Sequence, residues 1–475
     1  MNGIQMHPWK YIATLFIVIC LTYSQYLLAD DTDNESILIT TMLKDVDDMH
    51  QQFSQTFFRT LLKQPQYQSA KFPSLPALQK ELDKAPTQVV HNSALIVNNL
   101  AMIKSYYDDP TYFNYVEKLL AVNEFNAANQ LLNHIIEQGY DGLTARANYL
   151  LATYYFKREQ WSDVQALLSK DSNLLAPENH QHALLMAGIA LQQQGEHYKA
   201  IKIYEKIPAS SSHYTAAQLN LAIANLRQGW WTDGHIIIKD LLKAQQKRPQ
   251  EKTLNRLYIT LAYSLLNQGY YRTARNTFHQ VGINSRYANQ AILGIALTAA
   301  QQDDDIGALN ATRFLKNRPQ DDLPVHESHL LMPFFYEKSH QLVPASVGYS
   351  EASDYYQQKI KTINQALKSS FEIADLRINK NDSRRVSIAG NEVNLSTHYP
   401  DYFFANYNAI STFSNETQQI QQPALTKKLQ SLSQAYAKLA SKMSKKILSQ
   451  RASHLTSYLN QSRYGLARLF DNNTQ

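Results

Sequence analysis

The sequence predicts an all-α protein whose helices are stacked in pairs, forming an α-solenoid. Three observations support this prediction. A helical pair of similar pattern occurs three times, within residues 185–204, 219–234 and 258–278. Glycine and proline are sparse, with 14 and 15 residues, while hydrophobic residues make up 44% of the chain. Because 475 residues are too many for one compact core, a core that grows along one axis is favoured.

Residues 1–29 have the pattern of a secretory signal. Lys10 precedes an apolar run, and acidic residues follow Ala29, after which cleavage is expected. The alternative is an uncleaved anchor in the inner membrane, because residues 11–28 are only just long enough to span a bilayer. The single cysteine, Cys20, lies in this segment, so cleavage would leave no thiol, which suits an oxidising compartment. We therefore expect a periplasmic location in a bacterium, with the chain either released or membrane-anchored.

Residues 30–108 are helical in pattern but not repetitive. Met42, Val46 and Met49 are compatible with one amphipathic face, and the prolines of residues 72–76 interrupt the helical pattern. We interpret this region as an N-terminal helical cap over the first repeat.

Residues 109–350 carry the repeats. In the central three units a small residue is followed seven positions later by glycine, and five positions after that by another small residue. Small residues allow two antiparallel helices to approach closely, and glycine ends the first helix because it tolerates a left-handed conformation. Weaker copies on both sides extend the series to about seven helix pairs. The small residues expected in packing are Gly188, Ala200, Ala222, Gly234, Ala262 and Ala274.

This pattern resembles the tetratricopeptide repeat, or TPR, whose units have 34 residues. The resemblance covers about half of the chain and implies a protein-interaction scaffold whose first helices line a concave groove. The residues that it places there are Tyr149, Thr153, Phe156, Lys157, Gln192, Gln193, Asn220, Arg227, Tyr263 and Asn267. Only Lys157, Asn220, Arg227 and Asn267 resemble the set with which some TPR domains bind a peptide carboxylate. An aromatic and amide-rich groove for a protein or peptide is therefore favoured, and solvent exposure or packing between repeats is the alternative.

Residues 351–398 are expected to form a long helix, to about Leu376, and a polar linker, with a short hairpin or loop at 386–397. Residues 399–475 are expected to form a basic, coiled-coil-like helical region, because apolar residues follow one another in steps of four and three. This ladder contains Leu425, Leu429, Leu432, Tyr436, Leu439, Met443 and Ile447. One long helix or a helical hairpin fits the ladder, and pairing within or between chains stays open.

The stretch 417–470 contains no Asp or Glu, so the net charge of +6 is concentrated near the C-terminal end. A basic cluster beside the ladder consists of Lys438, Lys442, Lys445, Lys446 and Arg451. It is either a solvated helix face or a contact for an acidic partner or an anionic membrane surface. Nucleic acid is not expected as the partner of a secreted chain. Deletion of residues 423–475 is expected to leave a folded solenoid with weakened binding.

The sequence contains no phosphate-binding loop, zinc-protease motif or nucleophile elbow. His180 and His182 are two residues apart and would face different sides of a helix. Asp303–Asp305 reads as a solvated loop rather than a cation site. We therefore expect no cofactor, no metal and no enzymatic activity. The predicted function is a scaffold that binds other cell-envelope proteins, and the alternative is a periplasmic module that recognises a small ligand or a glycan.

Overall fold

The computed structural model describes residues 34–169, 171–245, 251–319, 322–369, 385–388, 391–394 and 400–472. The expected signal or anchor at 1–29 lies outside these residues. No helix in the described part of the chain is long and apolar enough to cross a membrane. The chain divides into two compact units, and both are made of segments that are distant in sequence. Unit 1 comprises Met1–Leu38, Gly229–His398 and Ser441–Gln475, and unit 2 comprises Ile39–Gln228 and Tyr399–Ala440.

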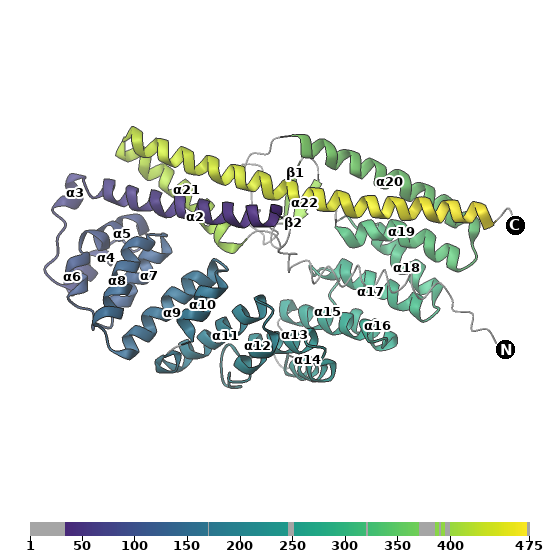
Figure 1. Ribbon diagram of the computed structural model, residues 1–475, viewed down its shortest axis with the longest axis horizontal. Coiled ribbons are helices and arrows are strands. Elements are labelled where there is room, and N and C mark those ends of the chain that lie inside the picture. The colour runs from purple at the N-terminus through teal and green to yellow at the C-terminus, as the bar shows by residue number, and fades with distance from the viewer. Residues whose placement is uncertain are drawn as a thin grey trace. The chain divides into compact units, whose positions relative to one another are not determined.

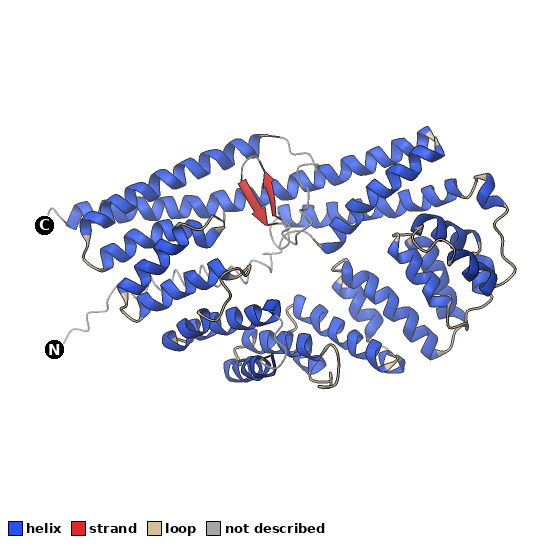
Figure 2. Ribbon diagram, turned by 180° about the vertical axis from the view of Figure 1, so that it is seen from behind, coloured by secondary structure: helices blue, strands red, loops and turns tan. Residues whose placement is uncertain are grey.

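The described residues are almost entirely helical, apart from one hairpin (Figures 1 and 2). Before the repeats lie α2 (Asn34–Leu61), α3 (Pro65–Gln68), α4 (Leu75–Leu82), α5 (Val89–Asn98) and α6 (Leu100–Lys104). The repeats contain α7 (Tyr112–Ala121), α8 (Phe125–Gln138), α9 (Asp141–Lys157), α10 (Trp161–Leu168), the 3-10 turn η1 (Ser172–Leu174), α11 (Pro177–Gln193), α12 (His197–Tyr204), α13 (Tyr214–Arg227), α14 (Trp231–Gln245), α15 (Glu251–Asn267), α16 (Tyr271–Phe278), α17 (Ala288–Gln301), α18 (Asp305–Lys316), α19 (Leu323–Lys338) and α20 (Leu342–Lys368). The remaining elements are β1 (Arg385–Ile388), β2 (Asn391–Asn394), α21 (Asp401–Ile420) and α22 (Pro423–Asn472).

The repeat prediction is confirmed. From α7 to α20, first and second helices alternate along the chain through seven successive pairs. The three turn glycines, Gly195, Gly229 and Gly269, all have φ between +77° and +80°, which L-residues with a side chain adopt only with strain. All six small residues expected in packing are buried. At Gly188 an added β-carbon would lie 2.4 Å from the ring of Tyr204, so this position has room only for glycine.

In unit 2, α2, α21 and the first part of α22 pack together through aromatic rings. Phe413 of α21 makes edge-on contacts with Phe53 and Phe57 of α2, at centroid distances of 5.3 and 5.0 Å. Tyr436 of α22 contacts the ring of Phe403 and hydrogen-bonds His50 at 3.0 Å. α2 also contacts the first repeats, because Ser54 donates to Glu124 at 2.9 Å and Asp47 pairs with Arg158 at 3.0 Å. Its packing against the repeats agrees with the cap interpretation, whereas its partnership with α21 and α22 was not expected.

In unit 1, the last repeat pair, α19 and α20, packs against the later part of α22. Glu337 on α19 accepts two hydrogen bonds from the guanidinium of Arg468, at 2.9 and 2.7 Å. Gly465 lies against the ring of Tyr349 on α20, with a clearance too small for a β-carbon. Deletion of residues 423–475 would uncover these buried groups. The expectation that the truncated chain stays folded stays a prediction, and loss of these contacts should lower its stability.

Three further expectations concern the segments after the repeats. α20 ends at Lys368 rather than near Leu376, and residues 370–384 lie outside the described part of the chain. Strands β1 and β2 form an antiparallel hairpin with Arg385 opposite Asn394, so the hairpin alternative is correct there (Figure 2). The ladder after Pro423 forms one helix, α22, and not a helical hairpin. The predicted domain boundaries stay a prediction.

Candidate protein-binding surfaces

Four of the predicted groove residues are each the last residue of a first helix. Lys157 ends α9, Gln193 ends α11, and Arg227 ends α13, and all three side chains are exposed in unit 2. α9 contacts α11, and α11 contacts α13, so these helix ends follow one another in unit 2. Asn267 ends α15 in unit 1 and is half-buried. We call Lys157, Gln193 and Arg227 the helix-end row.

The groove candidates near the middle and end of α9 are largely occupied with packing. Tyr149, Thr153 and Phe156 are all half-buried. Tyr149 and Phe156 pack against a buried cluster that includes Ala152 and Met186 of successive first helices. The ring of Phe156 also contacts Trp161 at 5.5 Å. Tyr149 bonds His182 on the next first helix, whereas Phe156 contacts the second helix of its own pair. Packing, the alternative that the sequence left open, therefore occupies both side chains.

The amide candidates differ in their exposure. Gln192 is buried, and its Oε1 accepts a hydrogen bond of 2.9 Å from the hydroxyl of Tyr204 on the second helix of the same pair. Its side chain is thus engaged inside the repeat and is not open to a partner, in contrast to the prediction. Gln193 next to it is exposed, because one step along a helix turns a side chain by about 100°. Asn220 on α13 is half-buried.

Tyr263 is the groove candidate at the centre of α15 in unit 1. Its hydroxyl donates to the backbone oxygen of Gln290 at 2.9 Å, and its ring contacts Phe278 at 4.9 Å. Tyr263 therefore links its own repeat to the next one. Because the ten candidates are divided between unit 2 and unit 1, each set is described separately.

A histidine pair in unit 2 was missed as a pair by the sequence analysis. The rings of His182 and His213 stack at 4.9 Å, and the Nδ1 atom of His182 hydrogen-bonds the Tyr149 hydroxyl at 2.8 Å. Burial, together with the neighbouring His213, lowers the pKa of His182. His180, by contrast, bonds the backbone oxygen of Ser172. His180 and His182 therefore contact different parts of the repeats. Within the described residues, no group of three or more His, Cys, Asp or Glu is placed to hold a metal ion.

The acidic triplet is held by ion pairs in unit 1. Asp303 and Asp305 lie 3.0 and 3.5 Å from the ammonium of Lys338 on α19. Asp304 accepts from the backbone of Gly307 at the start of α18 and pairs with Arg275 at 2.7 Å. These two interactions lower the pKa of Asp304. The triplet thus fastens the turn before α18, and each of the three acids has a cationic partner there.

The basic cluster lies along α22. Lys438 is exposed, whereas Lys442, Lys445, Lys446 and Arg451 are half-buried. The apolar ladder beside it is buried at Leu425 through Ile447, and its Tyr436 packs on α2 and α21 of the same chain. The part of the ladder in unit 2 therefore has an intramolecular partner. The role of the basic side chains themselves stays a prediction.

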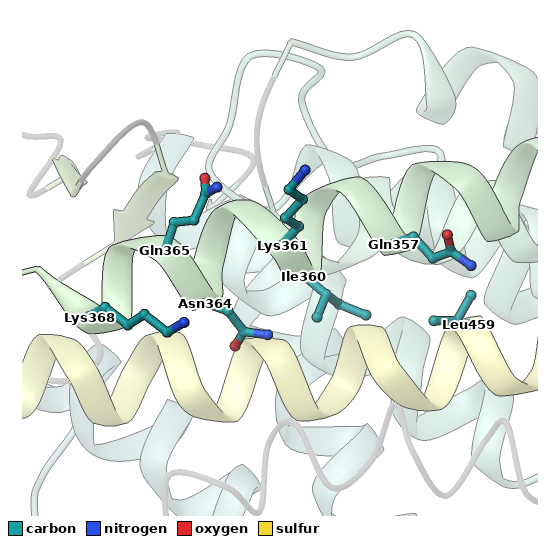
Figure 3. A pocket seen from close by; sticks show the side chains of 7 residues that line it. All are labelled: Gln357, Ile360, Lys361, Asn364, Gln365, Lys368 and Leu459. Atoms are coloured by element: carbon teal, nitrogen blue, oxygen red, sulfur yellow. The ribbon is translucent and has the colours of Figure 1, made fainter.

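A shallow groove of about 440 Å³ lies between α20 and α22 in unit 1 and was not predicted from the sequence. Its lining consists of Gln357, Ile360, Lys361, Asn364, Gln365, Lys368 and Leu459 (Figure 3). Ile360, Asn364 and Lys368 lie on the side of α20 that faces α22, and Lys361 points away from α22 (Figure 3). The lining therefore combines two cations, three amides and two aliphatic residues, and it contains no acid.

No protein-family model matches the chain, and no curated protein matches it. Among solved structures, the apo form of the quorum sensor NprR from B. thuringiensis is similar at a TM-score of 0.36 and 11% identity, over 72% of this chain and 97% of that chain. BtubC from P. vanneervenii is similar at a TM-score of 0.32 and 16% identity, over 51% of this chain and 98% of that chain. A signal-transduction ATPase with a tetratricopeptide repeat sensor from Pyrococcus horikoshii is similar at a TM-score of 0.36 and 13% identity. The match covers 66% of this chain and 51% of that chain. Because these TM-scores are low, the TPR-like fold is established by the helix pairs of the chain itself.

Proposed function

We propose that the chain is a non-enzymatic scaffold of the bacterial cell envelope that binds partner proteins, and that the helix-end row of unit 2 contacts the partner. The observation that carries the proposal is the regular exposure of Lys157, Gln193 and Arg227 at the ends of three successive first helices. The other first-helix candidates are partly or fully buried, so among the ten candidates this row is the most accessible to a partner.

The chemistry of the row favours a polar, acidic partner segment. Two cations flank an amide that can both donate and accept hydrogen bonds. Packed helices lie about 10 Å apart, which corresponds to about three residues of extended chain. An extended peptide that spans the three helices would therefore place its two ends near Lys157 and Arg227. An acidic residue near each end would pair with these cations. Cations at helix C-termini are also favourable without a partner, so the row has a structural role that the test must separate from binding.

The envelope location rests on the sequence pattern of residues 1–29 and is part of the proposal. The mass of the mature chain tests it. Removal of the first 29 residues would support release into the periplasm, and the full mass would support an anchor. A cytosolic chain in cell fractionation would contradict both.

The binding role is tested by affinity capture from detergent-solubilised envelopes with the double variant Lys157→Glu, Arg227→Glu. A matched control is Lys199→Glu, Lys206→Glu, because these exposed lysines lie on and just after α12 and the net charge change is the same. We expect a specific partner to be lost with the first variant and kept with the second. If no protein is captured but a cell-wall fragment raises the melting temperature, the alternative of ligand or glycan recognition is favoured instead.

A further inference from the structure

The groove between α20 and α22 arises from a difference in helix length. α19 has 16 residues and α20 has 27. The hydroxyl of Tyr356 on α20 donates to the backbone oxygen of His326, in the first turn of α19. The residues of α20 after Tyr356 therefore extend past the beginning of α19. In this stretch α20 lies beside α22, and none of the residues that line the groove belongs to α19 (Figure 3).

The lining of this place has a definite chemical character. Ile360 and Leu459 provide apolar contact area, and Gln357, Asn364 and Gln365 provide amides. Lys361 and Lys368 are exposed, and neither lies within ion-pair distance of a carboxylate in the described part of the chain. Other lysines of unit 1 are paired, such as Lys316 with Glu351 at 3.3 Å and Lys338 with Asp303 at 3.0 Å. The groove thus has a positive rim around an apolar floor.

We infer that this groove is a second docking surface, which takes an acidic amphipathic helix of a partner protein. Such a helix occupies the position beside α20 and α22 that α19 does not reach. Its apolar residues contact Ile360 and Leu459, as in other helix-in-groove complexes. Lys361 and Lys368 are seven residues apart, about 10.5 Å along α20, which matches acidic residues at positions i and i+7 of the partner helix. The inference is independent of the helix-end row, which lies in unit 2.

The test measures binding of a defined peptide to the full chain by fluorescence anisotropy. The probe is a labelled helical peptide with Glu at positions i and i+7 and Leu at i+3 and i+4. Reversing the rim with Lys361→Glu, Lys368→Glu should weaken binding by about tenfold or more, because two ion pairs become repulsions. A matched pair of exposed cations elsewhere in unit 1, Lys239→Glu and Arg272→Glu, should change the affinity less than about twofold.

Two further probes make the outcome specific. A peptide with Lys in place of Glu should bind the rim-reversed variant better than it binds the original chain. A peptide with Ser in place of Leu should bind the original chain weakly, because the apolar contacts are lost. The inference is overturned if the Glu and Leu peptide does not bind, or if both double variants weaken it equally. It is also overturned if sedimentation shows a dimer that only the rim-reversed variant loses, because the groove would then hold a second copy of the chain.

Discussion

At the scale of single residues, the approach of the paired helices depends on positions that have no room for a side chain. A β-carbon at Gly188 would lie 2.4 Å from the ring of Tyr204, and one at Gly294 would lie 2.3 Å from the ring of Phe278. The repeat pattern predicted that Gly188 is a packing position, because small residues recur there. It did not predict the ring: Tyr204 belongs to the same pair as Gly188, whereas Phe278 belongs to the pair before Gly294.

The substitution Gly188→Ala should lower the free energy of unfolding by about 1 to 3 kcal/mol, because the methyl group overpacks the contact with Tyr204. Gly142→Ala is the control, since no atom lies within 4 Å of its added β-carbon and the position is helical. That control should be neutral or more stable by up to about 1 kcal/mol. Urea unfolding of both variants checks the prediction, and equal effects at the two glycines would contradict it.

His50 should make unit 2 less stable in acid. Burial lowers its pKa to about 4, and the nearby Asp47 offsets this effect only in part. The unfolded chain takes up a proton near pH 6.5 and the folded chain only near 4, so the free energy of unfolding falls as the pH falls between these values. The loss from pH 7 to pH 5 should be about 2 kcal/mol. In urea unfolding, His50→Gln should gain about 2 kcal/mol in the free energy of unfolding relative to the unsubstituted chain when the pH is lowered from 7 to 5. An unchanged relative stability at the two pH values would exclude His50 as a source of acid sensitivity.

Glu327 in unit 1 should act in the opposite direction. Burial raises its pKa to about 7, although a hydrogen bond from Tyr458 favours the charged form. The folded chain therefore keeps a proton that the unfolded chain loses near pH 4.5, and stability falls as the pH rises from 4.5 to 7. Glu327→Gln retains an acceptor for Tyr458 and cannot ionise. When the pH is raised from 5 to 7, the free energy of unfolding of this variant should increase by about 2 kcal/mol relative to that of the unsubstituted chain. The same relative stability at both pH values would refute this assignment.

At the scale of helices, α22 shows what a periodic pattern can and cannot predict. The steps of four and three identified the buried face, which includes Leu429, Tyr436 and Leu439. They did not identify what covers it, because periodicity describes one helix and not its neighbours. The covering elements in unit 2 are α2 and α21, and the bond between His50 and Tyr436 joins residues 386 positions apart. Only the structure distinguishes this arrangement from pairing between chains.

The ion pair between Arg468 and Glu337 should matter for the docking of α22 in unit 1. The carboxylate is almost fully buried and also accepts from the hydroxyl of Tyr349. Arg468→Ala leaves this charge without its cation and should cost about 3 kcal/mol in the free energy of unfolding. Arg463→Ala, an exposed position on the same helix, should change it by less than about 0.5 kcal/mol. Comparable effects of the two substitutions in urea unfolding would show that the ion pair does not hold α22 in place.

At the scale of the whole molecule, the repeats were predictable and the two units were not. The pattern around Gly195, Gly229 and Gly269 lies within short windows, so it predicted the alternation of helices from α7 to α20. The units depend on contacts between distant segments, such as the bond from Asn406 to Asp47 in unit 2. The groove on α20 depends on where α19 begins, and helix ends are set by a few local residues. For the same reason the exposure of Gln193 and the burial of Gln192 required the structure.

The central claim is that the helix-end row contacts a protein partner, and photocrosslinking in intact cells tests it most directly. A photoreactive amino acid replaces Gln193 in the row and, as the control, Lys206, an exposed residue after α12. Neither position is buried, so both chains should fold normally. The account predicts a discrete crosslinked protein from position 193 that is absent from position 206 and is lost when Lys157→Glu and Arg227→Glu are added. No adduct at position 193, or equal adducts at both positions, would contradict it.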